Sequence, residues 1–256
     1  MNINDVSTQL LFMTTPIYTK KKTGETSVGT GFFYNKSHPT DPNLSIPMLV
    51  TNRHVIDNAS EGVIQIFTAD KDGKPITKER VSINLDSGFF SSFKISNEYD
   101  LAMIPIGGVF NHMNNIGNPP FFRAADKSII PNEEQRSELA AIEDIVFIGY
   151  PSGIIDSHSG LPLIRKGITA SPLWGKFQGK NEFLIDAGVF PGSSGSPVFI
   201  LNQGSYVSGT NLVVGTRVML VGFIYQTIQA LTDKAYLGLG RAINSSEIQK
   251  LSELFK

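Results

Sequence analysis

Short apolar segments bounded by turn residues recur along the whole chain of 256 residues. They are rich in β-branched and aromatic side chains, and Gly, Pro, Asn or Asp separates each segment from the next. Segments of this length and spacing are typical of the strands of a β-sandwich or barrel. The pattern therefore predicts an all-β fold, with strands over 31–34, 48–51, 63–67, 101–106, 145–148, 183–185, 197–201 and 218–225.

Helical periodicity is confined to two short stretches. Near the C-terminus, Ile248, Leu251 and the pair 254–255 form one apolar stripe. Asn244, with Glu247 three residues later, resembles a capping box at the start of this stripe. We therefore expect a C-terminal α-helix, and a shorter helical turn over 132–139.

The segment 117–142 separates two strand-rich halves of similar length. It contains a Pro-Pro pair at 119–120, Pro131 and a charged stretch over 132–138. We expect an N-terminal β-barrel over 1–125 and a C-terminal β-barrel over 126–256. No period of 20–50 residues repeats, which argues against a solenoid or propeller.

Composition narrows the class of protein. A net charge of −1 gives no reason to expect nucleic acid or a membrane surface as a partner, and the cationic run 20–22 before Thr23 and Gly24 is typical of a solvated hairpin tip. The absence of cysteine excludes disulfides, thiolate metal sites and a cysteine nucleophile. The N-terminus lacks the features of a secretory signal, and no apolar run approaches the roughly 18 residues that span a bilayer. We expect a soluble, cytoplasmic protein.

The segment 191–197, Pro-Gly-Ser-Ser-Gly-Ser-Pro, is the most informative one for chemistry. A serine hydroxyl is a poor nucleophile unless a base removes its proton and nearby donors stabilise the oxyanion. Gly192 and Gly195 allow a tight backbone turn around Ser194, so that consecutive N–H groups can converge on one point. Taken alone, the segment is equally compatible with a plain Gly/Ser turn before a strand.

Two further residues complete a set of three. His54 ends the apolar segment that begins at Met48, and Asp100 immediately precedes another apolar segment. Alone, each has a structural interpretation: a hydrogen-bonded histidine beside a strand, and an aspartate in a turn. Acyl transfer by serine requires a nucleophile, a base and an acid that orients the base, and the chain offers them in the order His54, Asp100, Ser194.

Other candidates for these roles are weaker. His38, His112 and His158 lie in loops and do not follow an apolar segment as His54 does. Asp57, three residues after His54, is the nearest alternative acid and is expected at the turn that follows. Four scattered histidines without clustered carboxylates predict no metal site, and no motif indicates a cofactor.

At this point the chain resembles the trypsin-like serine peptidases, and especially their bacterial intracellular and HtrA-like relatives. The family has a T-x-x-H-V motif, then D-[LI]-A, then G-x-S-G-x-P, and 51–55, 100–102 and 192–197 match in this order. Four further segments resemble the family: 29–33, 148–153, 221–225 and 238–243. No PDZ-like segment follows residue 256, so peptide sensing and trimer assembly in the HtrA manner are not expected.

The resemblance implies two antiparallel six-stranded β-barrels and a serine endopeptidase that acts on a protein or peptide substrate. It assigns Ser194 as nucleophile, His54 as base and Asp100 as the acid that orients His54. The backbone N–H groups of Gly192 and Ser194 are expected to form the oxyanion hole. The substrate-binding residues it implies are Gly188, Tyr225, Gln226, Thr227 and Gly240.

Departures from the digestive members of the family concern activation and specificity. Ser193 stands where zymogen-activated members have an aspartate, so we expect control by a regulatory protein partner, by substrate or by a mobile oxyanion loop rather than by propeptide cleavage. Gly188 stands where tryptic enzymes have an acid, so strict preference for Lys or Arg is not expected. Arg241 replaces the usual aromatic residue. It either points inward and favours an acidic substrate residue, or it points outward or is salt-bridged, which we favour.

Two other functional classes make different demands on the sequence. An α/β-hydrolase requires G-x-S-x-G with the acid and histidine after the serine, and here position 196 is Ser and the order is reversed. The alternative that is not an enzyme is a catalytically silent double barrel that only binds proteins. Complete candidates for the triad and for both oxyanion donors favour the enzyme.

Overall fold

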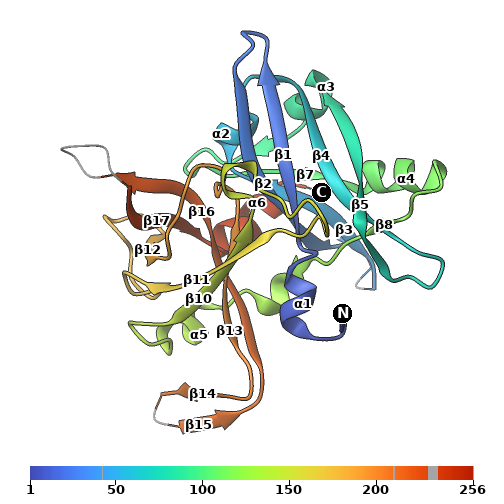
Figure 1. Ribbon diagram of the computed structural model, residues 1–256. Coiled ribbons are helices and arrows are strands. Elements are labelled where there is room, and N and C mark those ends of the chain that lie inside the picture. Colours follow the sequence, from blue (N-terminus) through green and yellow to red (C-terminus); the bar gives the residue numbers. More distant parts are fainter. Residues whose placement is uncertain (42, 210, 230–235, 256) are drawn as a thin grey trace.

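The computed structural model describes residues 1–41, 43–209, 211–229 and 236–255. The fold is predominantly β, with two large sheets side by side (Figure 1). The pairings are antiparallel as expected, except that β9 pairs with β2 in parallel. The first sheet is built from the N-terminal part of the chain and the second from the C-terminal part. The all-β prediction is confirmed at this level.

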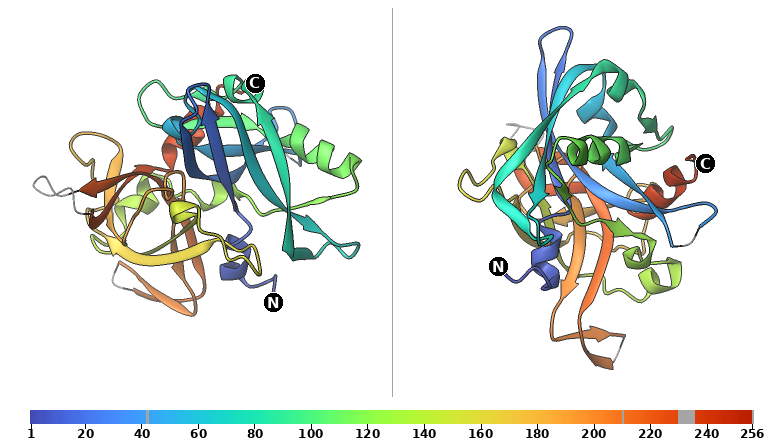
Figure 2. Two further views of the ribbon diagram at one scale, coloured as in Figure 1. Left: turned by 45° about the horizontal axis from the view of Figure 1, so that its top comes forward. Right: turned by 90° about the vertical axis from the view of Figure 1, so that its right-hand side faces the viewer.

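The C-terminal sheet is a closed barrel of six strands in the order β10-β11-β12-β17-β16-β13. Its closure confirms the expected number of strands for this half. A separate hairpin, β14 and β15, extends away from both sheets (Figures 1 and 2). The strand bounds are β10 Asp144–Gly149, β11 Leu163–Thr169, β12 Glu182–Asp186, β13 Pro197–Asn202, β14 Ser205–Ser208, β15 Asn211–Val214, β16 Arg217–Gln229 and β17 Tyr236–Asn244.

The N-terminal sheet has nine strands rather than the six expected. Its main path runs β5-β4-β1-β2-β3-β7-β6, while β8 pairs with β4 and β9 pairs with β2, and the described pairings do not join β5 to β6. Three of its strands have only two residues, too few for an alternating pattern to be visible in the sequence. The bounds are β1 Thr14–Lys21, β2 Thr26–Ser37, β3 Ser45–Thr51, β4 Ala59–Ala69, β5 Pro75–Asp86, β6 Lys94–Ile95, β7 Ala102–Pro105, β8 Pro120–Phe121 and β9 Ala125–Asp126.

Strands β2 and β3 are buried on both faces, which explains why their sequences are continuous apolar runs rather than alternating ones. Phe32 and Val50 point into a core shared by the two sheets, whereas Phe33 and Leu49 point into the core of the N-terminal sheet. The shared core also takes Phe223 from β16, whose ring centroid lies 6.1 Å from that of Phe32. The two sheets are therefore held together by apolar packing.

The helices are short. They are α1 Val6–Leu10, α2 Arg53–Ile56, α3 Ser87–Ser91, α4 Gly107–Asn115, α5 Glu133–Ser137 and α6 Ser246–Ser252, with 3₁₀ turns η1 Lys127–Ile129 and η2 Pro151–Gly153. The helical turn expected over 132–139 is α5, which begins with a capping box formed by Asn132 and Gln135.

The expected C-terminal helix is α6, but its predicted cap is wrong. The N-cap is Ser245, without a side-chain hydrogen bond, and Asn244 accepts from the Ser246 N–H at 3.0 Å. Glu247 is buried and accepts from Asn181 Nδ2 at 2.6 Å. A tertiary partner has therefore taken the carboxylate that the local pattern assigned to the cap. Ile248 and Leu251 pack in the shared core, whereas Leu254 is 58% exposed.

Candidate active site

His54 and Asp100 meet because of the register between β3 and β7. Thr51 at the end of β3 lies opposite Ala102 at the start of β7, and the strands are antiparallel. The residues just after Thr51 and just before Ala102 therefore emerge at the same edge of the sheet. His54 follows on α2, and Asp100 lies in the turn that leads into β7.

The Asp100 carboxylate binds His54 twice. Asp100 Oδ2 lies 2.5 Å from His54 Nδ1, and Asp100 Oδ1 accepts the His54 backbone N–H at 3.0 Å. Asn52 Nδ2 donates to the Asp100 carbonyl oxygen at 2.7 Å and steadies the turn. When Nδ1 donates its proton to the carboxylate, the neutral imidazole presents Nε2 as an acceptor. The contact thus selects the tautomer that a general base requires.

The loop before Ser194 has the features of a type II turn. The Ser193 N–H donates to the Phe190 carbonyl at 3.0 Å, Pro191 occupies the second position, and Gly192 at the third has φ +89°. A side chain on Gly192 would meet the Ser152 nitrogen at 2.6 Å, so only glycine fits. Among the described residues, neither the Gly192 nor the Ser194 N–H has a hydrogen-bond acceptor. Both donors are therefore available to a ligand.

Thr30 on β2 connects this loop to Thr51 on β3, the strand that leads to His54 on α2. Its N–H donates to the Ser194 carbonyl at 2.8 Å, and its hydroxyl donates to the Gly192 carbonyl at 3.2 Å. The same hydroxyl accepts from the Tyr150 N–H and Ser196 Oγ, and the Thr30 carbonyl accepts from Thr51 Oγ1 at 2.8 Å. Thr30 is fully buried and all its polar groups are paired. The only trace of this role in the sequence is a polar residue between two glycines at the start of an apolar run.

In the described part of the chain, no hydrogen bond joins Ser194 to His54, and the two residues are related through Thr30 and Thr51 instead. Hydrogen bonds between catalytic groups are often long before a substrate binds. The structure therefore brings His54 and Asp100 into direct contact, and it fixes the backbone on either side of Ser194.

Gly195, directly after Ser194, supplies a sharp prediction. It has φ +87°, and an ideal Cβ would lie only 1.9 Å from the Thr30 carbonyl oxygen. Gly24 in the β1–β2 turn has the same φ of +87°, but nothing lies within 4 Å of its Cβ position. Gly24→Ala should cost about 1–2 kcal/mol for the left-handed backbone alone.

Gly195→Ala must also displace the Thr30 carbonyl, so we expect it to lower the free energy of unfolding by at least about 3 kcal/mol. Urea unfolding of the two variants measures the difference. Equal losses of stability would show that the contact with Thr30 carries no cost.

The residues expected to bind substrate lie on β16, on β17 and in the loop after β12. Tyr225 Oη donates to Glu182 Oε2 at 2.8 Å, and Arg241 Nη2 donates to the same oxygen at 2.7 Å. Burial and the Glu182 carboxylate raise the pKa of the Tyr225 hydroxyl. Of the two alternatives for Arg241, the salt-bridged one is confirmed.

The remaining substrate-binding candidates are Gln226, Thr227, Gly240 and Gly188, which take no part in this ion pair. Gln226 is exposed and Thr227 is half-buried. Gly240 lies opposite Thr227 in the β16–β17 ladder, and a Cβ there would meet Val189 Cγ2 at 2.4 Å. Gly188 has φ +59° and lies next to Arg165.

Removing the charge of Glu182 should leave Arg241 without a counter-charge. The Glu182 side chain is 4% exposed and that of Arg241 is 21% exposed, so the pair is largely desolvated. We expect Glu182→Gln to lower the free energy of unfolding by about 3 kcal/mol. Asp144→Asn, which breaks the exposed pair with Lys166, should cause no measurable loss. Urea unfolding compares the two, and equal effects would contradict this account.

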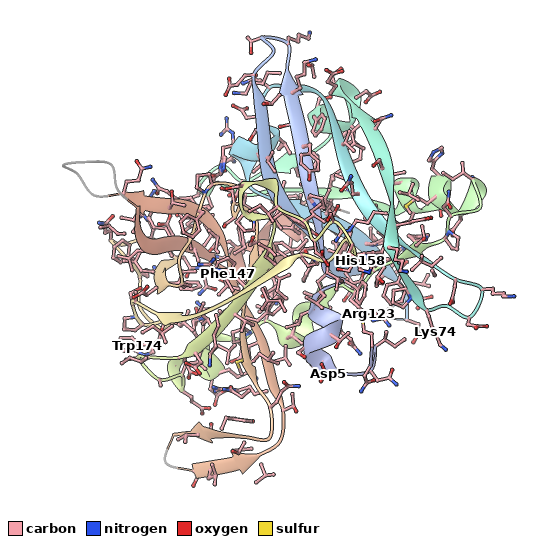
Figure 3. All side chains as sticks on the ribbon, viewed as in Figure 1. Asp5, Lys74, Arg123, Phe147, His158 and Trp174 are labelled. Atoms are coloured by element: carbon pink, nitrogen blue, oxygen red, sulfur yellow. The ribbon has the colours of Figure 1, made fainter. Side chains whose placement is uncertain are left out.

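The rival residues do not form a second site. His38 is exposed and its Nδ1 hydrogen-bonds to Thr40, and His158, labelled in Figure 3, is exposed in the loop after η2. Asp57 lies at the C-terminal end of α2 and accepts from Asn58. Across the described ranges, no group of three or more potential ligands could hold a metal ion. No helix in those ranges is long and apolar enough to cross a membrane.

Comparison with known proteins places the chain. The family profile of the trypsin-like peptidase domain matches residues 29–208, which includes His54, Asp100 and Ser194. No curated protein has a matching sequence.

Three solved structures share the fold. The HtrA-type protease AlgW with a tripeptide is similar with a TM-score of 0.54 and 18% identity, over 96% of this chain and 60% of that one. Deg5 gives a TM-score of 0.52 and 15% identity over 97% of this chain and 90% of its own. The thermostable serine protease AL20 from an extremophilic microorganism gives a TM-score of 0.50 and 13% identity over 94% of this chain and 95% of its own. The chain thus spans less than two thirds of the AlgW chain. By the match of its sequence to the family profile, and by its fold, it belongs to the trypsin-like peptidase family of proteases.

Proposed function

We propose that the protein is a serine endopeptidase that hydrolyses peptide bonds through an acyl-enzyme. The observation that carries the proposal is the double contact of Asp100 with the ring and the backbone of His54. This contact orients the imidazole, and the loop tied down by Thr30 presents Ser194 next to two unused N–H donors. These are the parts that acyl transfer by serine requires.

In this mechanism Ser194 Oγ attacks the peptide carbonyl while His54 Nε2 accepts its proton. The N–H groups of Gly192 and Ser194 stabilise the oxyanion of the tetrahedral intermediate. His54 then gives the proton to the leaving amine, and Asp100 stabilises the imidazolium in between. Water, activated by His54, hydrolyses the ester on Ser194 and restores the enzyme. No step needs a cofactor.

The substrate is proposed to be a protein or peptide chain that lies along β16 beside Tyr225, Gln226 and Thr227. Gly188 and Gly240 would flank the side chain before the scissile bond. We also propose that residues 1–125 and 126–256 act as two domains with the site between them, and that a regulatory protein partner or the substrate controls activity. Neutral hydrogen bonds from Thr30 and Ser152 hold the Pro191–Gly192 turn, which is consistent with activation that needs no new charged terminus.

Labelling with a fluorophosphonate probe tests the proposal. The wild type should be labelled, and peptide mapping should place the adduct on Ser194. Ser193→Ala should still be labelled, because the one hydrogen bond of the Ser193 hydroxyl within the described residues is accepted from the Phe190 N–H at 3.5 Å. A wild-type protein that stays unlabelled, with or without cell extract, would contradict the proposal and favour the catalytically silent protein-binding module.

A further inference from the structure

Arg165 on β11 points toward Gly188, below the loop that carries Ser194. It lies opposite Phe147 of β10 in the ladder, and Phe147, labelled in Figure 3, is buried in the core of the C-terminal barrel. Directly opposed residues of an antiparallel pair project to the same face, so Arg165 projects to the inner face of the barrel. Its Nη2 donates to the Gly188 carbonyl at 3.1 Å.

The Arg165 guanidinium occupies the space that a side chain at Gly188 would take. An ideal Cβ on Gly188 would lie 2.2 Å from Arg165 Nη2. Gly188 is itself held in place, because its N–H donates to the Gly238 carbonyl at 2.8 Å. A positive group has therefore taken the place of a side chain at this position.

Arg165 differs from two other half-buried arginines of the same barrel, because the part of the chain that the structure describes gives it no counter-charge. Arg217 pairs with Glu143 at 2.8 Å, and Arg241 pairs with Glu182 at 2.7 Å. Among the described residues no carboxylate lies within ion-pair distance of Arg165, whose other contact is the Phe190 ring, 5.4 Å from its Cζ. A half-buried guanidinium favours a carboxylate partner because its planar N–H groups can bind both oxygens.

We propose that Arg165 selects an acidic side chain, Glu or Asp, in the substrate residue before the scissile bond. The inference rests on the proposed function, which places Gly188 at the pocket for that residue. Arg241, the arginine that the sequence singles out, is neutralised by Glu182, whereas Arg165 has no such partner among the described residues. The substrate carboxylate supplies the counter-charge that those residues do not provide.

Peptides that differ only in the residue before the scissile bond test the proposal. For the wild type we expect kcat/KM for Glu or Asp to exceed that for Gln, Leu and Arg by about 100-fold or more, since a site built to bind a polar group rejects analogues that lack it. Arg165→Gln should bring the Glu-to-Gln ratio close to one, and Arg165→Glu should move the preference toward Arg. Lys166→Gln, at the exposed neighbouring position on β11, should leave the ratios unchanged.

Fluorophosphonate labelling of each variant separates the two proposals. If the labelling rate persists while the Glu-to-Gln ratio collapses in Arg165→Gln, the assignment holds. It is overturned if the labelled wild type cleaves the Leu or Arg peptide as well as the Glu peptide, or if Arg165→Gln keeps the wild-type ratio. The kcat/KM values of the wild type on the set of peptides test the preference for Glu or Asp even if the Arg165 variants do not fold. Absence of labelling in the wild type would overturn the proposed function itself, and this inference with it.

Discussion

Ser194→Ala is expected to lower kcat by about six orders of magnitude, because no other group can take the acyl chain. His54→Ala should lower kcat by a similar factor. The double variant should lower kcat little more than either single variant does, since the two residues act as one unit. Steady-state kinetics with a peptide substrate measure kcat for the two single variants and the double variant.

The control is Ser193→Ala, which removes the adjacent hydroxyl and should retain most of the activity. Appreciable turnover by Ser194→Ala, or losses of the two single variants that multiply in the double variant, would contradict the assignment of nucleophile and base.

Asp100→Asn is expected to lower kcat by about 10⁴-fold with little change in KM. An asparagine can keep the shape of the site, but its amide can donate toward His54 Nδ1 and so favour the wrong tautomer. The second contact, from the His54 backbone N–H to Asp100 Oδ1, can persist in the variant and preserve the fold of the turn.

Asp57→Asn is the matched control for this prediction. Asp57 is also an aspartate close to His54, but its carboxylate accepts only from Asn58 within the described structure. Its loss should change kcat by less than about twofold. Equal effects of the two substitutions would show that nearby negative charge, rather than the contact with Nδ1, supports catalysis.

Much of the fold is visible in the sequence because burial leaves a local signature. The apolar runs around Phe32 and Leu49 reveal strands buried on both faces, and the stripe of Ile248 and Leu251 reveals the C-terminal helix. The additional pairings of β6, β8 and β9 leave no such signature, since two residues form no pattern. The cap of α6 was mispredicted because Glu247 is used by Asn181, far away in the sequence.

The candidate site likewise contains residues that leave a signature in the sequence and residues that do not. His54, Asp100 and Ser194 stand out as candidates in the sequence because each follows or precedes a recognisable strand, and the order of the three is informative. Thr30 and Arg165 do not stand out, because the contacts that draw attention to them depend on which strands lie opposite one another. Arg165 donates to Gly188, which follows the neighbouring strand β12, and a single sequence does not specify that register. The same limit applies to Arg241, whose partner Glu182 lies 59 residues earlier.

The central claim is that a peptide bond is broken through an ester on Ser194. The most direct measurement is mass spectrometry of the wild type mixed with an activated acyl-peptide ester and quenched in acid within milliseconds. A covalent acyl adduct that maps to Ser194, and that disappears as product forms, is the predicted result. Product formation without any adduct on Ser194, or an adduct on another residue, would contradict the account.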